Sequence, residues 1–303
     1  MSGAIPGLSP TAPVPHSPQI NSPATRALSP IRAVPRNLEN DEGGDRKSFD
    51  THFDDVSAIR HHYRRRVDYH NAEKRLTLQI KAICRRLCDG DKDDAGKLYK
   101  AMMGGQGAED AQRLVVSPLI ALSACEPLLQ ARDIVEQFRK DEEKVLTKLG
   151  KTLPVWAWCE EIRGVGPLSL AQIIGETGDL FLYANPGKVW KRLGLAPFNG
   201  RACSTWRMQG GATADDWVEM GYSPVRRSVA FNVGECFIKA GGKYKEIYDE
   251  KKVEYLEREW CGKCHPKGET EPREHCTPAH AHNRAHRYMV KKFIKHLWQE
   301  WRK

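Results

Sequence analysis

The sequence has no long apolar run. No segment approaches the 18 or so consecutive apolar residues that a membrane-spanning helix needs. The first residues also lack the charged, apolar and small-residue zones of a secretory signal peptide. The nine cysteines are an odd number with no evident disulfide framework, which is typical of free thiols in a reducing compartment. We therefore expect a cytoplasmic protein with no membrane partner.

Several catalytic signatures are absent as well. The chain contains no P-loop, no dinucleotide-binding fingerprint, no nucleophile elbow and no His-Glu-x-x-His motif, which argues against a metabolic enzyme built on any of them. Positive charge, by contrast, is in excess. The 303 residues hold 48 Lys and Arg against 39 Asp and Glu, a formal net charge of +9, which favours a polyanionic partner.

Residues 1–48 have no aromatic side chain and hold eight of the 18 prolines. Such a segment cannot bury enough apolar area to offset the entropy of ordering. We predict a disordered Pro/Ser-rich tail. Its four Ser-Pro steps leave two interpretations open, a solvated leader or a docking and phosphorylation segment. The whole chain of 303 residues has the length of about two domains.

Residues 49–153 are predicted to form a helical hairpin or coiled coil. The first helix carries an apolar stripe at Leu76, Ile80, Ile83 and Leu87. After a Gly-rich break, the second helix is expected to pack through Ile134, Phe138, Val145 and Leu149. We expect the chain to form a homo-oligomer through this helical region.

The first predicted helix also has a basic face. Residues 57–88 hold nine Lys or Arg against Asp68 and Glu73. A face of this charge density either follows nucleic-acid phosphates or is simply solvated. The sequence leaves both interpretations open.

Beyond the hairpin, the chain three times places proline just inside a helix start and glycine just past its end. The predicted helices run from Pro167 to Gly178, from Pro186 to Gly194 and from Pro224 to Gly241. Asn185 and Ser223 are the expected N-caps of the second and third. The fold class is therefore mostly α.

We predict that residues 154–303 form a helix-hairpin-helix-like DNA-binding domain, in which the helices from Pro167 and Pro186 make the pair. Gly164-Val165-Gly166 lies at a helix start, where residues without Cβ let backbone N–H groups approach a phosphate. The alternative is a tight turn that binds nothing. The candidate DNA-binding residues are Arg163, Gly164, Gly166, Lys188, Arg192, Arg226, Arg227 and Arg287.

The order of motifs in this region resembles the C-terminal domain of insertion-sequence transposases of the 110/116/902 family, which use a guide RNA. The matching residues are Arg163-Gly164-Val165-Gly166-Pro167, Gly175-Glu176-Thr177-Gly178-Asp179, Gly194-Leu195-Ala196-Pro197, Gly221 and Arg226. The resemblance covers about residues 130–303. It implies DNA transposition and recombination in a mobile genetic element or phage, with DNA and a structured guide RNA as partners, and a nucleoid-associated location.

The resemblance also implies a composite active site, in which an RNase-H-like domain supplies four metal-binding carboxylates and a serine after the Gly-Leu-x-Pro motif is the nucleophile. Residues 1–150 show no strand pattern for such a domain, so those carboxylates and their Mg²⁺ would have to come from a second polypeptide. Ser204, beside Cys203, is the nearest match to the serine. Ser204 is therefore either the catalytic nucleophile or a polar loop residue.

Four residues near the C-terminus have the spacing of zinc ligands. Cys261 and Cys264 are followed by Cys276 and His280, a set that can close a tetrahedral structural site. Three further histidines offer substitutes, namely His265, His275 and His282. The alternative is a reduced loop with scattered thiols. Zn²⁺ is accordingly the expected cofactor of this loop.

The last helix combines an apolar stripe with a basic face. Residues 281–303 hold seven Lys or Arg and one acid, and the stripe is expected at Tyr288, Phe293, Leu297 and Trp301. The sequence as a whole predicts a protein that binds the nucleic-acid backbone in transposition or recombination. The alternative is a non-catalytic structural adaptor, in which the coiled coil and a zinc-stabilised loop bind proteins.

Overall fold

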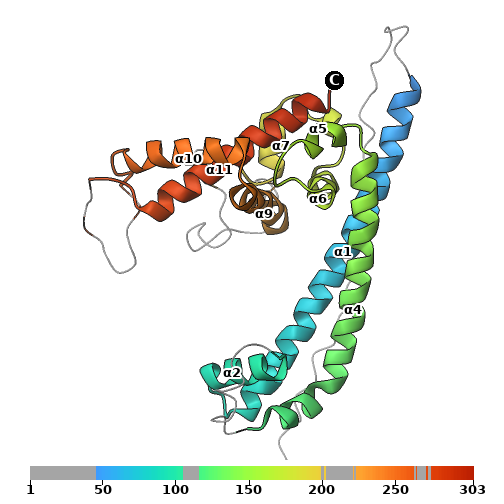
Figure 1. Ribbon diagram of the computed structural model, residues 1–303, viewed down its shortest axis with the longest axis vertical. Coiled ribbons are helices and arrows are strands. Elements are labelled where there is room, and N and C mark those ends of the chain that lie inside the picture. The colour runs from blue at the N-terminus through green and yellow to red at the C-terminus, as the bar shows by residue number, and fades with distance from the viewer. Residues whose placement is uncertain are drawn as a thin grey trace, which may run out of the picture. The chain divides into compact units, whose positions relative to one another are not determined.

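A computed structural model describes residues 46–104, 116–198, 201–202, 221, 223–262, 264, 271 and 274–303, with backbone alone for 46–53, 198 and 201–202. These residues are mostly helical, which confirms the predicted fold class (Figure 1). The predicted tail overlaps the start of the first helix, and its residues 1–45 lie outside the described part of the chain. No described helix is both long and apolar enough to cross a bilayer.

The described elements follow one another in chain order. The helices are α1 (Arg46–Leu87), α2 (Lys92–Met102), α4 (Pro118–Thr152), α5 (Trp156–Glu160), α6 (Pro167–Thr177), the 3-10 turn η1 (Leu180–Leu182), α7 (Pro186–Arg192), α9 (Pro224–Ala240), α10 (Lys243–Leu256) and α11 (Pro278–Glu300). The two-residue strands β1 (Pro197–Phe198) and β2 (Arg201–Ala202) pair antiparallel, with Pro197 opposite Ala202.

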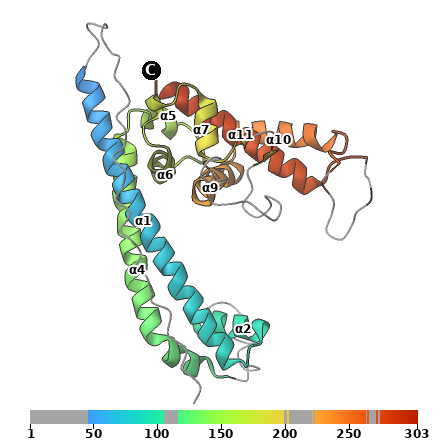
Figure 2. The same cartoon turned by 180° about the vertical axis from the view of Figure 1, so that it is seen from behind.

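Helices α1 and α4 lie side by side (Figures 1 and 2). Near α2 they enclose a small core around Ile80, Leu98 and Ala121. Ile80 belongs to the apolar stripe that the sequence predicted on the first helix. The stripe predicted on α4 is wrong at Ile134 and Phe138, whose exposed fractions are 57% and 50%. The face of α4 that is buried farther along the helix holds Glu142, Leu146 and Gly150 instead.

The buried face of α4 includes the carboxylate of Glu142. A search for apolar stripes therefore does not find this face. Glu142 accepts a hydrogen bond from His62 Nδ1 at 2.7 Å and pairs with Arg65 at 2.9 Å. Buried carboxylates persist where hydrogen bonds and opposite charges compensate them.

The larger core lies among α6, α9, α10 and α11, and its central aromatic rings are those of Phe237, Tyr244 and Phe293. The three predicted Pro-to-Gly helices correspond to α6, α7 and α9. Asn185 caps α7 by accepting a hydrogen bond from the Lys188 N–H, whereas Ser223 makes no side-chain cap bond.

Two glycines allow α6 to approach the hairpin. A Cβ on Gly150 of α4 would lie 2.2 Å from the Pro167 carbonyl oxygen, and one on Gly175 of α6 would lie 2.5 Å from the Tyr63 ring. The hairpin and the C-terminal helices therefore share one packed core, which includes Leu146 of α4 and Leu170 of α6.

We predict that Gly150→Ala lowers the free energy of unfolding by about 1–3 kcal/mol, because the new methyl meets backbone that cannot move aside. Gly96→Ala in α2 is the matched control. A Cβ on Gly96 meets nothing within 4 Å, so this change is expected to stabilise by about 0.5–1 kcal/mol. Urea denaturation followed by circular dichroism measures both. Equal effects of the two substitutions would contradict the packing described here.

Candidate metal centre and basic pocket

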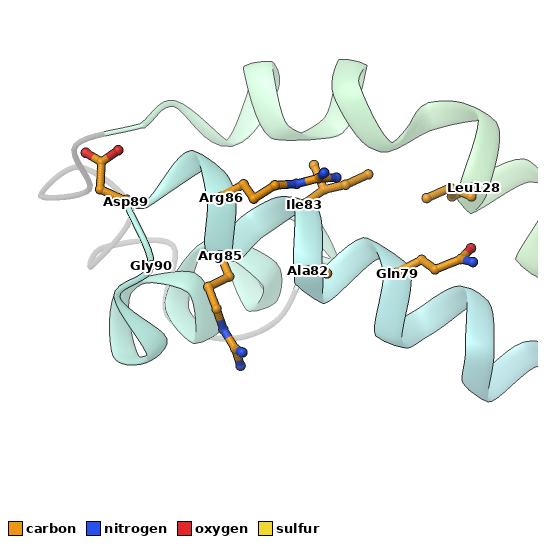
Figure 3. Close-up of a pocket in the computed structure, with 8 residues that line it drawn as sticks. All are labelled: Gln79, Ala82, Ile83, Arg85, Arg86, Asp89, Gly90 and Leu128. Carbon is orange, nitrogen blue, oxygen red and sulfur yellow. The ribbon is translucent and has the colours of Figure 1, made fainter. Parts of the chain in front are cut away.

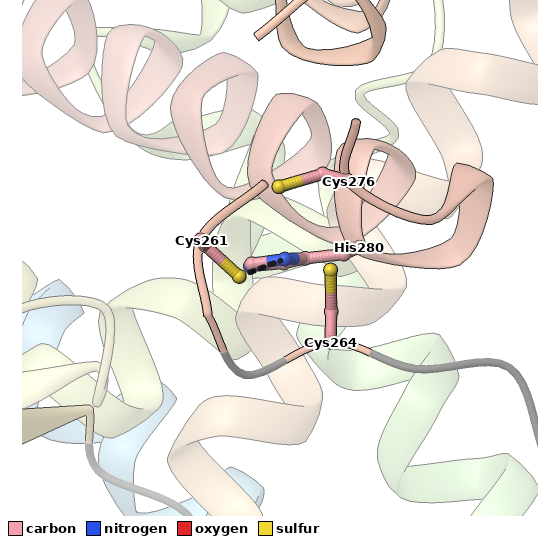
Figure 4. Close-up of side chains that lie close together, drawn as sticks. All are labelled: Cys261, Cys264, Cys276 and His280. Carbon is pink, nitrogen blue, oxygen red and sulfur yellow. Dashed lines mark hydrogen bonds between the residues drawn. The ribbon is translucent and has the colours of Figure 1, made fainter. Parts of the chain in front are cut away.

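Four side chains converge between the end of α10 and the start of α11. The ligand atoms of Cys261, Cys264, Cys276 and His280 all lie within 4.8 Å of one another. Cys261 Sγ lies 3.3 Å from His280 Nδ1. Figure 4 shows the three sulfur atoms arranged around the imidazole ring. The structure thus brings together all four residues that the sequence predicted as metal ligands.

Backbone hydrogen bonds hold the two halves of the cluster together. Glu259 and His275 form an antiparallel bridge, and the Trp260 N–H donates to the Glu274 carbonyl at 2.9 Å. Thr277 then starts α11 as its N-cap, with Oγ1 accepting from the His280 N–H at 3.2 Å. The helix start therefore fixes the position of the one histidine ligand.

The environment of Cys264 favours its thiolate. Burial acts to raise its pKa, but hydrogen bonds from the Thr277 N–H and from the side chains of His280 and Cys261 lower the pKa to about 6. Burial raises the pKa of the Cys276 thiol. A thiolate is the form of cysteine that binds a metal, so one strong ligand is available near neutral pH.

The spacing of the cluster fits a bound ion. Metal-to-sulfur bonds of about 2.3 Å in a tetrahedron place neighbouring ligand atoms about 3.8 Å apart, and the observed separations bracket that value. The other histidines are used elsewhere or lie outside the described residues. His282 bonds the Tyr248 hydroxyl, His275 lies near the Arg258 carbonyl, and His265 is not described. The cluster can therefore hold a metal ion through three thiols and one imidazole.

The Gly-Val-Gly turn connects α5 to α6 and lies at the start of α6, where the sequence placed it. Gly164 has a φ of 92°, and a Cβ there would lie 2.9 Å from the Cys236 carbonyl oxygen of α9. Packing thus accounts for this glycine without any ligand. Gly166 has open space around it and caps α6.

Two of the predicted DNA-binding arginines face an internal partner. Arg226 Nε donates to Glu176 Oε2 at 3.3 Å, Tyr63 donates to Glu176 Oε1 at 2.8 Å, and Arg192 Nε donates to the Glu176 backbone carbonyl at 3.1 Å. Burial and the charge of Arg226 lower the pKa of Arg192. Glu176 therefore compensates charge inside the fold. By contrast, Arg163 and Lys188 are exposed.

Arg227 and Arg287, also predicted to bind DNA, line one pocket of about 260 Å³. We call it the basic pocket. It is lined by Gly194, Leu195, Ala196, Pro197, Arg227, Tyr255, Arg284, Arg287, Tyr288 and Lys291. Sequence reasoning missed Arg284 and Lys291 as site residues, although their spacing from Arg287 on a helix puts all three on one face.

The cations that α11 contributes to this pocket, Arg284, Arg287 and Lys291, have no carboxylate partner in the described part of the chain. No carboxylate belongs to its lining among the residues that the structure describes. Burial lowers the pKa of Arg287, and the charges of Arg227 and Arg284 lower it further. Burial and the charge of Arg287 lower the pKa of Lys291. Each cation thus repels its neighbours.

The basic face of α1 is different, because α4 supplies it with carboxylates. Arg65 pairs with Glu142 at 2.9 Å and Arg66 with Glu143 at 3.0 Å. Arg139 of α4 pairs in turn with Glu73 of α1 at 2.7 Å. Part of the predicted basic face is therefore an interhelical ion-pair network.

A wider hollow of about 760 Å³ lies at the far end of the hairpin (Figure 3). It is lined by Gln79, Ala82, Ile83, Arg85, Arg86, Asp89, Gly90 and Leu128. The Arg85 guanidinium points away from Leu128 and Asp89 in Figure 3. The hollow thus lacks the convergent polar groups of a binding site.

Comparison of the chain with family models, curated proteins and solved structures finds no match. Ser204 and Cys203 lie outside the described residues, so the nucleophile stays a prediction. Among the described residues, the Cys/His cluster is the one group of three or more close metal-ligand side chains. The four carboxylates that the resemblance implies are not gathered in that part of the chain.

We predict that metal-stripped protein titrated with Co²⁺ develops the intense near-ultraviolet and visible bands of tetrahedral thiolate coordination. Cys264→Ser should weaken the thiolate band and the affinity, because it removes the readiest thiolate. Cys236→Ser is the control, since Cys236 is an exposed thiol of α9 outside the cluster. Identical titrations of the two variants would contradict the assignment of these ligands.

Proposed function

We propose that this protein binds the phosphate backbone of nucleic acid through its C-terminal domain, residues 154–303, and does so in transposition or recombination. The observation that carries the proposal is the uncompensated positive charge of α11. The setting rests on the resemblance of about residues 130–303 to the transposase family, and the binding rests on charge and geometry.

Helix α11 carries its cations without carboxylate partners. Within the described residues, the ion pairs that involve α11 are His286 with Glu235 and Glu300 with Lys303. Arg284 instead stacks on Tyr255 at 4.6 Å, and Lys291 lies over Trp190 at 5.4 Å. Cation–π contacts hold such groups in place without neutralising them. A polyanion supplies the missing negative charge and gains entropy from released counterions.

The opposite face of α11 explains why these cations are held rigidly. Phe293, Leu297 and Trp301 are buried, as the predicted stripe requires, whereas Tyr288 lines the basic pocket. The helix is therefore anchored along its length, and its charged face has a fixed direction.

We further propose that Zn²⁺ is the ion of the Cys/His cluster and that its role is structural. Three thiolates and one imidazole fill a tetrahedral shell and leave no open position for chemistry. The cluster joins the loop after α10 to the first turn of α11, four residues before Arg284. Bound zinc would thus fix the start of the helix that carries the phosphate contacts.

We predict about one equivalent of zinc in protein purified without a His-tag, and a lower melting temperature after chelation, because binding energy becomes folding energy. Elemental analysis and thermal denaturation measure both effects. His280→Ala should lose the metal, with Cys236→Ser again as the control. Zinc below about a tenth of an equivalent would overturn this part of the proposal.

We predict a steep salt dependence of nucleic-acid affinity. Three or more phosphate contacts give a slope of log K against log salt of about −2.7 or steeper for duplex DNA. Arg284→Gln should reduce the slope by about 1. Lys148→Gln on α4 removes the same charge from an exposed site of the hairpin and should leave the slope unchanged. Fluorescence anisotropy over a range of KCl concentrations tests this. A flat slope, or no measurable binding, would contradict the proposal and favour the adaptor.

A further inference from the structure

We propose that the basic pocket is a discrete binding site for one phosphate group. This inference rests on the proposed function for its ligand source, a phosphodiester of the nucleic-acid backbone. The pocket itself is argued from the residues that line it.

Four segments of the chain meet at this pocket. Helix α11 contributes Arg284, Arg287 and Lys291, which follow one another at intervals of three and four residues. Arg227 comes from the first turn of α9 and Tyr255 from the end of α10. The segment 194–197 after α7 completes the lining. Cations from separate elements thus enclose a common space, which a solvated helix face does not do.

The size of the pocket suits a small anion. Its volume of about 260 Å³ lies just below the roughly 300–1,000 Å³ of pockets for drug-sized ligands. The guanidinium groups of Arg284 and Arg287 and the ammonium group of Lys291 offer several donors each, and guanidinium binds phosphate oxygens in a bidentate manner. Phosphate is the common small anion that matches this number of donors.

The donors are already held in position. Arg287 Nε donates to the Asn283 carbonyl of its own helix at 3.2 Å, so its terminal nitrogens are the ones left for a ligand. Arg284 and Lys291 are held over the Tyr255 and Trp190 rings. Side chains fixed before binding lose less entropy when the ligand arrives.

Other arginines of this protein are neutralised by carboxylates within the fold. Arg226 and Arg192 share Glu176, whose side chain is only 12% exposed, and Arg65 reaches the buried Glu142. The described lining of the basic pocket has no such carboxylate. Partly buried like charges without a counter-ion repel one another. A bound anion would balance the charges of Arg284, Arg287 and Lys291, which have no carboxylate partner among the described residues.

The test is thermal denaturation of the full chain with inorganic phosphate, titrated at constant ionic strength against KCl. Phosphate should raise the melting temperature of the wild type by a few degrees, because it binds the folded state alone. Arg287→Gln should weaken the phosphate affinity at least tenfold. Lys148→Gln removes one positive charge at an exposed site of the hairpin, outside the pocket, and should respond like the wild type.

Stability without phosphate gives a second readout. Removing one of several repelling cations should leave the Arg287→Gln protein as stable as the wild type or more so. A purely structural arginine would instead cost stability on removal. Equal phosphate responses in all three proteins would reveal a general salt effect and contradict the phosphate site. An Arg287→Gln protein that is clearly less stable than the wild type in the absence of phosphate would also contradict it.

Nucleic-acid binding by the same variants separates the two proposals. A salt slope reduced by about 1 in Arg287→Gln supports a backbone phosphodiester as the ligand. If Arg287→Gln weakens phosphate binding but leaves the salt dependence of nucleic-acid affinity unchanged, the ligand is not a backbone phosphodiester. The pocket would then be a site for free phosphate or a phosphorylated small molecule. Phosphate binding without any nucleic-acid affinity would overturn the proposed function and leave the pocket standing.

Discussion

The burial of one face of α11 is the constraint on which the packing of the C-terminal helices depends. Phe293 and Leu297 are fully buried and the Phe293 ring packs against Phe237 and Tyr244. This packing sets the rotation of the helix, and the helix in turn presents its cations to the basic pocket and His280 to the thiol cluster. The core, the basic pocket and the Cys/His cluster thus all depend on the orientation of one helix.

Charge compensation separates the two halves of the molecule. The hairpin neutralises several of its arginines internally through Glu73, Glu142 and Glu143, which joins α1 to α4. Helix α11 leaves its central cations without carboxylates in the described part of the chain. Charges that are paired within the fold attract a polyanion less strongly, which is why we propose α11 and not the hairpin as the nucleic-acid contact.

The sequence predicted features whose signals are local. Proline and glycine marked the ends of α6 and α9 because they act on the backbone of a single turn, and the ligand set of Cys261 and His280 was recognisable from spacing. The sequence did not predict the features that residues far apart in the chain form together. Ile134 and Phe138 were expected in the core, but the buried face of α4 is set by partners on α1. The basic pocket joins Arg227 to Lys291 across 63 intervening residues, and no local pattern encodes that meeting.

The central claim is that nucleic acid contacts the charged face of α11, and photochemical crosslinking followed by peptide mapping tests it most directly. The full chain would be irradiated with duplex DNA and with RNA, and the modified peptides identified by mass spectrometry. The account predicts crosslinks within residues 281–303 and around Tyr255, where aromatic rings lie beside the cations. Crosslinks confined to the α1–α4 hairpin, or none with either nucleic acid, would contradict it.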